Sequence, residues 1–262
     1  MDRNNAIESP MWVDTHCHLD VEPLCLKQIE VLDRARNAGI GHFIVPGIRG
    51  PAKNFISPNV LFAWGVHPGN ASFFENIDLK DLFAQRNYDP VAIGEIGLDI
   101  QSPADFNLQL KIFSTQLEIA KAENLPVLIH LRGFWNQALA ALKNTASDLP
   151  WVMHAFSGNF EIAKLFLRGN AFISFGGSLC FSNAKKTPRV ALETPIEKIL
   201  LETDAPDMAP PGWKKDENEP AALLDVAKKL CQIKKIELSE LKSQVWKNIQ
   251  KARLMDDFAL HD

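Results

Sequence analysis

Residues 151–177 read WVMHAFSGNFEIAKLFLRGNAFISFGG and hold one complete strand, a helix and a second strand. The runs 151–154 and 171–175 are short and rich in β-branched and aromatic residues, which indicates strands. Between them, residues 160–168 carry apolar side chains at helical spacing. Two strands joined by a helix within so short a segment predict a parallel β-α-β unit.

The same alternation runs along most of the chain. By the same criteria, further strands are expected at residues 11–16, 42–46, 61–66, 91–95, 127–130 and 198–202. Further helices are expected at residues 24–38, 79–85, 104–124, 135–146 and 182–192, and two closing helices at 219–232 and 239–254. Each step from strand to strand takes about 26 residues, the length of one strand, one helix and two loops. We therefore predict a single α/β domain, a (β/α)8 TIM barrel over residues 11–262, with an N-terminal extension over residues 1–10.

The composition fits a packed globular protein. Hydrophobic residues make up 46% of the 262 residues, unlike a disordered chain. Lys and Arg number 28 against 32 Asp and Glu, a net charge of −4, which argues against a strongly basic nucleic-acid coat protein. No apolar run approaches the length of a membrane helix. The four cysteines lack the spacing of a zinc ribbon, so we expect reduced thiols in a cytoplasmic protein. We also expect a monomer with no membrane partner and no obligate protein partner.

Histidines gather where the expected strands end. Five of the seven histidines lie at or just past the carboxyl end of a strand, namely His16, His18, His67, His130 and His154. In a TIM barrel the catalytic residues come from this rim. His16 and His18 are two residues apart, so in a strand both imidazoles face the same way and can bind one divalent metal.

Two carboxylates join these histidines. Glu95 ends the apolar run 91–95, where a carboxylate directed into a barrel is costly unless it meets a cation. Asp204 follows the last strand, which lies beside the first strand when the barrel closes. We therefore predict two divalent ions bridged by Glu95: the first is held by His16, His18, Glu95 and Asp204, and the second by Glu95, His130 and His154.

Two such ions predict hydrolysis. A pair of divalent ions deprotonates a bridging water and stabilises both the attacking and the leaving oxygen at phosphorus. Asp204 is the best candidate for the general base, and Glu95 is the bridging ligand. Glu202 and Asp14 either orient ligand histidines or form structural ion pairs. Histidine-rich ligation suits Zn²⁺ or Mn²⁺, while the carboxylates leave room for Mg²⁺.

The chain resembles the TatD family of metal-dependent hydrolases, within the amidohydrolase-like TIM barrels. The matching motifs are Asp14-Thr15-His16-Cys17-His18, Gly94-Glu95-Ile96-Gly97-Leu98-Asp99, His130-Leu131-Arg132, His154-Ala155-Phe156-Ser157-Gly158 and Glu202-Thr203-Asp204-Ala205-Pro206. The family's metal ligands fall on the same six residues named above. The resemblance implies a deoxyribonuclease, typically a Mg²⁺-supported 3′–5′ exonuclease on single-stranded DNA ends. The continuation through Asp207 and Met208 resembles the YjjV-like subgroup.

Two departures from the family pattern affect substrate binding. Ile100 and Gln101 follow Asp99, where the family often has an aromatic and a basic residue. The segment Glu217-Asn218-Glu219-Pro220 lacks the arginine that often precedes the asparagine. Both changes remove phosphate contacts, so the metal chemistry is expected to stand while substrate preference stays open.

Several residues are candidates for substrate binding. Arg132 is expected to clamp phosphate through its guanidinium, unless it is a surface arginine. His67 reaches substrate or supports the metal ligands, unless it is a plain loop histidine. A basic group near the last loops either contacts phosphate or forms a solvated face, and it comprises Lys185, Lys186, Arg189, Lys214 and Lys215.

Two other functions remain open from the sequence. One is a hydrolase of a small amide, ester or lactone on the same scaffold. Such enzymes often bridge their metals with a modified lysine, whereas Glu95 holds that place here. The other is a non-catalytic metal-binding or scaffold protein, which the complete set of six ligands disfavours.

Overall fold

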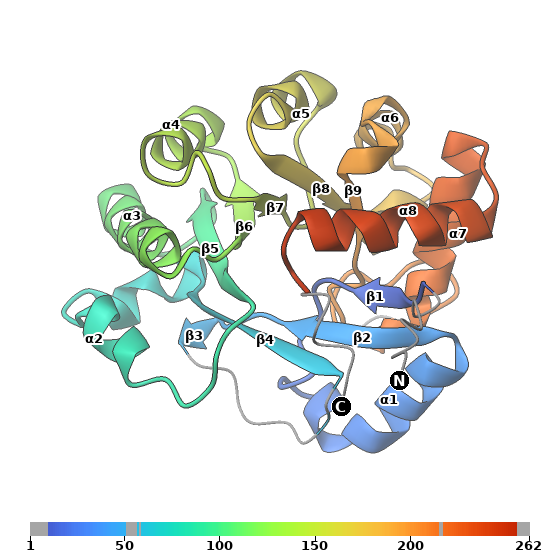
Figure 1. The fold of residues 1–262 in the computed structure, drawn as a ribbon, viewed down its shortest axis with the longest axis horizontal. Helices are drawn as coiled ribbons and strands as arrows, with labels where there is room; N and C mark the ends of the chain where they lie inside the picture. The colour runs from blue at the N-terminus through green and yellow to red at the C-terminus, as the bar shows by residue number, and fades with distance from the viewer. Residues whose placement is uncertain (1–9, 51–56, 58, 215–216, 256–262) are drawn as a thin grey trace, which may run out of the picture.

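A computed structural model describes residues 10–50, 57, 59–214 and 217–255. Within these residues, eight strands pair in parallel and form a nearly closed barrel (Figure 1). This arrangement confirms the predicted TIM barrel. The barrel strands are β1 (Trp12–Asp14), β2 (Ile40–Val45), β4 (Val60–Val66), β5 (Ala92–Asp99), β6 (Val127–Arg132), β7 (Trp151–Met153), β8 (Ala171–Phe175) and β9 (Ile199–Leu201).

The strands follow one another around the barrel in chain order, from β1 and β2 through β4 to β9. Hydrogen bonds just beyond the strands then join β9 to β1. The Thr15 amide donates to the Leu201 carbonyl oxygen at 3.1 Å, and the Asp204 amide donates to the His16 carbonyl oxygen at 2.9 Å. The two ends of the sheet therefore meet as barrel closure requires.

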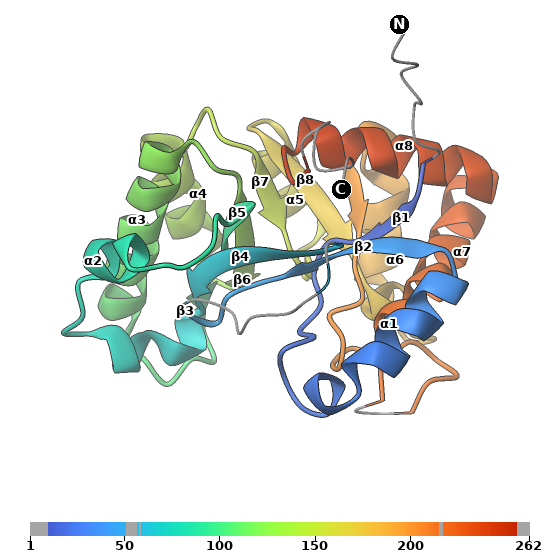
Figure 2. The ribbon, with the colours of Figure 1, turned by 60° about the horizontal axis from the view of Figure 1, so that its bottom comes forward.

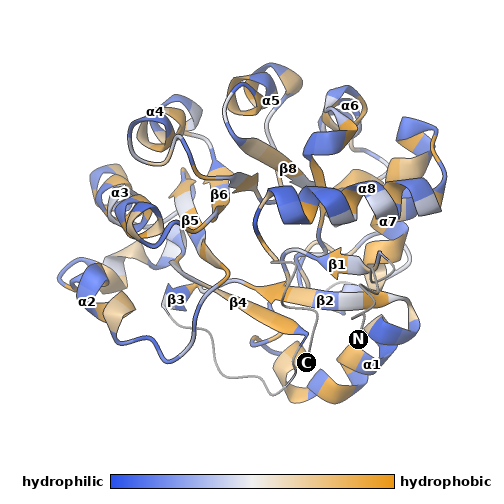
Figure 3. Ribbon diagram, viewed as in Figure 1, coloured by the Kyte–Doolittle hydropathy of each residue, from blue (hydrophilic) through white to orange (hydrophobic). Residues whose placement is uncertain are grey.

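Helices cover the outside of the barrel (Figures 1 and 2). The apolar sides of the helices pack on strands whose residues are almost all buried, and the strands are predominantly hydrophobic (Figure 3). No helix among the described residues is long and apolar enough to cross a membrane. The helices are α1 (Gln28–Asn37), α2 (Leu79–Ala84), α3 (Phe106–Glu123), α4 (Trp135–Thr145), α5 (Phe160–Leu167), α6 (Lys186–Glu193), α7 (Leu223–Lys234) and α8 (Leu238–Lys251).

Short 3-10 helices complete the connections between these elements. They are η1 (Leu24–Leu26), η2 (Pro68–Phe74), η3 (Gly177–Cys180), η4 (Ile196–Lys198) and η5 (Pro220–Ala222). An additional two-residue strand, β3 (Arg49–Gly50), pairs antiparallel with the end of β4. The sequence did not indicate β3, because two residues are too short for a period of two.

Two expected strand boundaries were wrong in ways that affect the site. Strand β1 ends at Asp14, so His16 and His18 lie in the loop that follows it. Strand β5 continues to Asp99, so Glu95 lies inside a strand instead of at its end. The continuation arises because residues 96–99 still pair with β6. The predicted extension over residues 1–10 lies outside the described residues except for its last residue.

Candidate metal centre

Glu95 lies at the centre of a cluster of histidines at the carboxyl end of the barrel. Its Oε2 atom lies 3.2 Å from His16 Nε2 and 3.8 Å from His18 Nε2. Its Oε1 atom lies 2.8 Å from His130 Nδ1 and 3.7 Å from His154 Nε2. The two oxygens of one carboxylate therefore face two different pairs of histidines.

Asp204 lies between the same two pairs. Its Oδ1 atom lies 3.5 Å from His18 Nε2, 3.9 Å from His16 Nε2 and 3.6 Å from His154 Nε2. The rings of His16 and His154 stack with their centroids 3.5 Å apart. The structure thus brings together all six residues that the sequence predicted as metal ligands.

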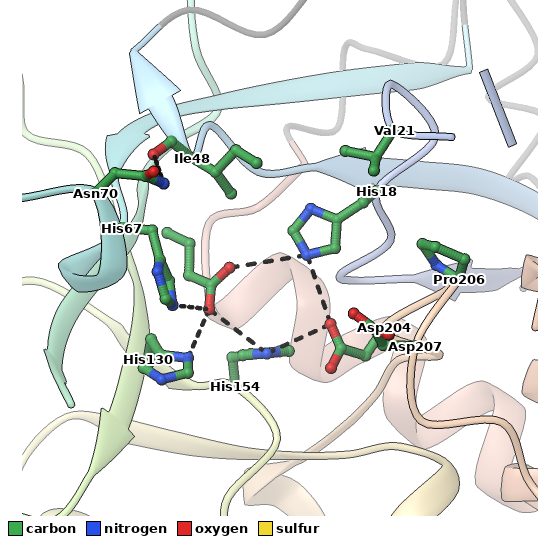
Figure 4. A pocket seen from close by; sticks show the side chains of 11 residues that line it. His18, Val21, Ile48, His67, Asn70, His130, His154, Asp204, Pro206 and Asp207 are labelled. Atoms are coloured by element: carbon green, nitrogen blue, oxygen red, sulfur yellow. Dashed lines mark hydrogen bonds and ion pairs between the residues drawn. The ribbon is translucent and has the colours of Figure 1, made fainter. Parts of the chain in front are cut away.

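The cluster opens into a cavity of about 290 Å³. Figure 4 shows the side chains of His18, His67, His130, His154 and Asp204 directed toward one another around it. Further wall residues come from η2 and from the segments after β1, β2 and β9, and they include Val21, Ile48, Asn70, Pro206 and Asp207. The cavity is large enough for a small charged group to lie over the cluster.

Local backbone features position these side chains. Gly97 has a φ of 153°, and a Cβ atom there would lie 1.7 Å from the His130 carbonyl oxygen. Only glycine allows β5 to approach β6 so closely, and this approach sets Glu95 beside His130. On the other side of the barrel, the buried Asp14 carboxylate accepts hydrogen bonds from the Thr203 amide at 2.9 Å and from the Thr203 hydroxyl. Asp14 therefore holds the segment that carries Asp204 and does not orient a histidine ring.

The pKa values of Glu95, Asp204 and His16 are all lowered within the cluster. Burial alone would raise the pKa of Glu95, but the surrounding histidines, chiefly His16 and His154, hold it well below its usual value. The same balance lowers the pKa of Asp204, where His154 acts most strongly against burial. Burial lowers the pKa of His16. The centre therefore offers ionised carboxylates beside a neutral imidazole, which is the protonation state that a metal ligand set requires.

The pKa values of His130 and His154 are raised instead of lowered. Burial would lower both values, but Asp99 and Glu95 raise the pKa of His130 to about 9. Glu202 and Asp204 raise the pKa of His154 to about 10 in the same way. In the absence of a bound cation these two histidines balance the carboxylates by holding protons.

The donor set fits divalent cations. His16 is 1% exposed, and neither of its ring nitrogens has a hydrogen-bond partner of good geometry within the described part of the chain. A buried imidazole in this position is costly unless another group satisfies it. Three sets of possible ligand atoms lie close together: His16 with His18 and Glu95, His16 with His154 and Glu202, and His67 with Glu95 and His130.

Two further carboxylates contact the histidines from behind. Glu202 is fully buried, and its Oε1 atom lies 3.1 Å from His154 Nδ1. Asp99 Oδ2 lies 3.0 Å from His130 Nε2. The Asp99 contact is a hydrogen bond of the kind that fixes the orientation and tautomer of a metal-binding histidine. Glu202 Oε1 instead accepts a hydrogen bond from the Ala155 amide at 2.7 Å and faces His154 Nδ1 at ion-pair distance. The two expectations for Glu202 were an orienting role and a structural ion pair, and its distance to His154 is that of an ion pair. The contact of Asp99 with His130 was missed.

The role of Asp99 has a signal in the sequence. A period of two along β5 puts residues 95, 97 and 99 on one face of the strand. Asp99 was overlooked because the strand was expected to end at Glu95. The amide of Asp99 in turn donates to Gln109 Oε1 of α3 at 2.9 Å, so a buried glutamine fixes the end of β5.

His67 is held in one tautomer. Its Nδ1 atom accepts a hydrogen bond from the Gly69 amide at 3.0 Å. Burial lowers the pKa of His67 to about 4, so the ring is neutral near pH 7. A neutral imidazole carries one proton, and here that proton is on Nε2, which lies 3.6 Å from Glu95 Oε1. His67 therefore presents a donor to the cavity instead of a free metal-binding nitrogen.

Other expected binding residues lie farther out. Arg132 is exposed at the end of β6, and its guanidinium donates to Gln101 Oε1. It does not line the 290 Å³ cavity. Lys185 and Lys186 are exposed at the start of α6, while Lys215 lies outside the described residues.

Comparison with known families agrees with this geometry. Residues 13–252 match the model of the family described as TatD related DNase. The match covers the barrel from the second residue of β1 onward and every residue of the cluster.

The chain belongs to the TatD family.

Two curated TatD-family relatives are similar over nearly the whole chain. YabD of Bacillus subtilis is 33% identical over 254 residues, which cover 92% of this chain and 98% of the relative. YjjV of Escherichia coli is 34% identical over 251 residues, which cover 90% of this chain and 95% of the relative. Both are described as uncharacterized metal-dependent hydrolases. This chain is likewise a metal-dependent hydrolase of the TatD family.

Solved structures of TatD proteins share the fold. The crystal structure of Escherichia coli YjjV superposes with a TM-score of 0.80 and 30% identity, covering 94% of this chain and 98% of that chain. A TatD family hydrolase from Entamoeba histolytica superposes with a TM-score of 0.81 at 24% identity, covering 93% of this chain and 98% of that chain. The barrel is therefore the TatD architecture.

Proposed function

We propose that this TatD protein is a deoxyribonuclease that uses two divalent ions, and that it removes nucleotides from single-stranded DNA ends in the 3′–5′ direction. One observation carries the proposal: the two oxygens of Glu95 face separate histidine pairs, with Asp204 between them. A carboxylate shared in this way is the arrangement that holds two ions close together. The family's description as TatD related DNase supports DNA as the substrate.

The residues divide into two ligand sets. His16, His18, Glu95 Oε2 and Asp204 would hold the first ion, and Glu95 Oε1, His130 and His154 would hold the second. Asp99 holds the ring of His130 from behind by a hydrogen bond, and the Glu202 carboxylate lies at ion-pair distance from the ring of His154. Mg²⁺, Mn²⁺ and Zn²⁺ all accept this mixture of carboxylate and imidazole.

When bound, the ions would supply Lewis acidity, which lowers the pKa of water and neutralises charge on phosphate oxygens. Asp204 then has the role of general base. Its side chain is 15% exposed and faces the cavity, and its lowered pKa keeps it ionised near neutral pH, the state that can accept a proton from water. The water oxygen forms a bond to phosphorus while the bond from phosphorus to the leaving nucleotide oxygen breaks, and that oxygen takes a proton from solvent.

Two residues would bind the substrate phosphate. The Nε2–H group of His67 can donate to a phosphate oxygen over the cluster, because its tautomer is fixed by the Gly69 amide. Arg132 has the bidentate shape for phosphate and lies on the same strand as His130. Its exposed position suits a phosphate at the mouth of the barrel and not the scissile one.

A substrate panel tests the proposal. Purified protein is supplied with Mg²⁺, Mn²⁺ or Zn²⁺ and offered end-labelled single-stranded and double-stranded DNA, together with small esters, amides and lactones. We expect nucleotides to be released from the 3′ end of the single strand. If every DNA substrate stays intact with each metal while an amide or lactone is cleaved, the proposal is wrong and the chain is a small-molecule hydrolase.

A further inference from the structure

A second cavity adjoins the metal centre. This groove has a volume of about 390 Å³ and is lined by residues of the loops after β7, β8 and β9. Ala155 and Met208 belong to its wall, and each directly follows a residue that lines the metal cavity, His154 and Asp207 respectively. The groove therefore continues from the metal cavity along two separate segments of chain.

The two cavities differ in charge. The metal cavity is lined by three carboxylates, Glu95, Asp204 and Asp207. The groove has no acidic residue among its described lining residues, and two lysines line it instead, Lys185 and Lys186. One cavity thus suits cations and its neighbour suits anions.

The lysines of the groove are available to a ligand. Lys185 and Lys186 are exposed, and no ion pair joins either side chain to an acidic residue in the described part of the chain. Neutral hydrogen-bonding groups lie beside them, on Ser157, Asn183 and Thr187. Ammonium and hydroxyl groups together are a common arrangement for contacting phosphate oxygens.

The groove also has an apolar side. Phe156 is buried beneath it, and the Met208 side chain is 36% exposed at its edge. A ligand with alternating phosphate and flat apolar groups, as in a single nucleic-acid strand, matches both sides of the groove.

We infer that this groove binds the phosphate next to the scissile one in a single strand that passes from the metal centre toward α6. The inference rests on the proposed nuclease function and adds that the substrate is a strand with at least two phosphates. Lys185 and Lys186 hold the second phosphate, and this contact selects a polynucleotide over a small phosphodiester.

A charge-reversal experiment tests this strand path. The groove variant is Lys185→Glu with Lys186→Glu. Its matched control is Lys143→Glu with Lys247→Glu, which changes the net charge equally at exposed positions. Lys143 is in the last turn of α4, which leads to the start of β7. Lys247 is on α8 beside Asn248, and the side-chain amide of Asn248 donates to the Ile199 carbonyl oxygen at the start of β9. Both control residues therefore lie toward the opposite end of the barrel.

The metal-loaded proteins are compared on a short single-stranded oligonucleotide and on bis(p-nitrophenyl) phosphate, which has one phosphodiester group. We expect the ratio of kcat/KM for the strand to kcat/KM for the small diester to fall about tenfold in the groove variant relative to the control. The slope of log kcat/KM against log salt for the strand should shrink by about 0.7, because the loss of one phosphate contact on a single strand removes about 0.7. The charge-neutral pair Lys185→Gln with Lys186→Gln should give a smaller shift in the same direction, and thermal unfolding confirms that each variant folds.

The outcomes separate the two proposals. If the native protein cleaves the strand while the groove and control variants give the same ratio and salt slope, the strand path is wrong and the nuclease function stands. If the native protein cleaves no phosphodiester with any of the three metals, the nuclease function is wrong and the strand path falls with it.

Discussion

His130 Nε2 lies 3.0 Å from Asp99 Oδ2, while Nδ1 of the same ring lies 2.8 Å from Glu95 Oε1. One histidine thus joins the Glu95 carboxylate to a second carboxylate farther out on the same strand. Because Asp99 contacts the ring on the side away from the cluster, it controls both the orientation and the basicity of His130.

Replacing Asp99 should weaken the second ion without removing a ligand. In Asp99→Asn the amide oxygen can still accept a hydrogen bond, but the negative charge is lost. We expect the pKa of His130 to fall from about 9 toward its usual value. Metal affinity should fall by about 10-fold to 100-fold. NMR titration of His130 and calorimetric metal titration measure the two effects, and an unchanged pKa together with unchanged affinity would show that Asp99 plays no part.

Metal binding should release protons. The metal-free protein holds protons on His130, with a pKa of about 9, and on His154, with a pKa of about 10. Burial would lower the pKa of the third ligand histidine, His18, but Asp204 and Glu95 raise it. A ligand histidine must be neutral, so loading at pH 7 should release about two to three protons, and affinity should rise with pH until about pH 9–10. Calorimetry in buffers of different ionisation enthalpy counts these protons. A release close to zero at pH 7 would contradict the assignment of these ligands.

The metal-free protein should become less stable as pH rises, whereas metal affinity rises with pH. Both histidines have pKa values raised above the unfolded value of 6.5. Their contribution to the free energy of unfolding is therefore complete below about pH 6.5 and is lost as pH rises through 9 and 10. Urea unfolding of chelator-treated protein at pH 6.5 and pH 9.5 measures this loss, and equal stability at the two values would refute it.

A buried glutamine on α3 holds the end of β4 beside His67. Gln116 Oε1 accepts from the Val66 amide at 2.6 Å, and Nε2 donates to the Val66 carbonyl oxygen at 3.2 Å. Gln116→Met keeps the size of the side chain but leaves two buried backbone groups unsatisfied, so we expect a loss on the order of 2–4 kcal/mol in unfolding free energy. Gln137→Met, at an exposed position on α4, is the matched control. Equal urea midpoints for the two variants would contradict this role.

Much of the fold and the cluster could be predicted because a parallel barrel fixes which strands are neighbours. Closure of the barrel placed Asp204 beside His16, and the amide of Asp204 indeed donates to the His16 carbonyl oxygen at 2.9 Å. Consecutive strands likewise placed Glu95 near His130 and His154. These relationships depend only on strand order, which the alternation of strands and helices reveals.

The length of β5, the contact of Asp99 with His130 and the tautomer of His67 could not be predicted, because they depend on contacts that the hydropathy pattern does not show. The β5 ladder continues beyond Glu95 because Asp99 still pairs with Arg132 on β6, although polar residues there suggested a strand end. The contact of Asp99 with His130 also depends on the close approach at Gly97. His67 is defined by a hydrogen bond from Gly69, and no sequence pattern indicates which ring nitrogen accepts it.

Metal content tests the central claim most directly. Glu95→Gln keeps the size of the side chain but removes the charge shared by both ligand sets, and Glu75→Gln, at an exposed position, is its control. The native protein and the control, loaded and then dialysed, should each contain about two divalent ions per chain by elemental analysis. Glu95→Gln should remain folded by circular dichroism and contain fewer than about one ion per chain. If Glu95→Gln still holds two ions with native affinity, Glu95 does not bridge a two-metal centre.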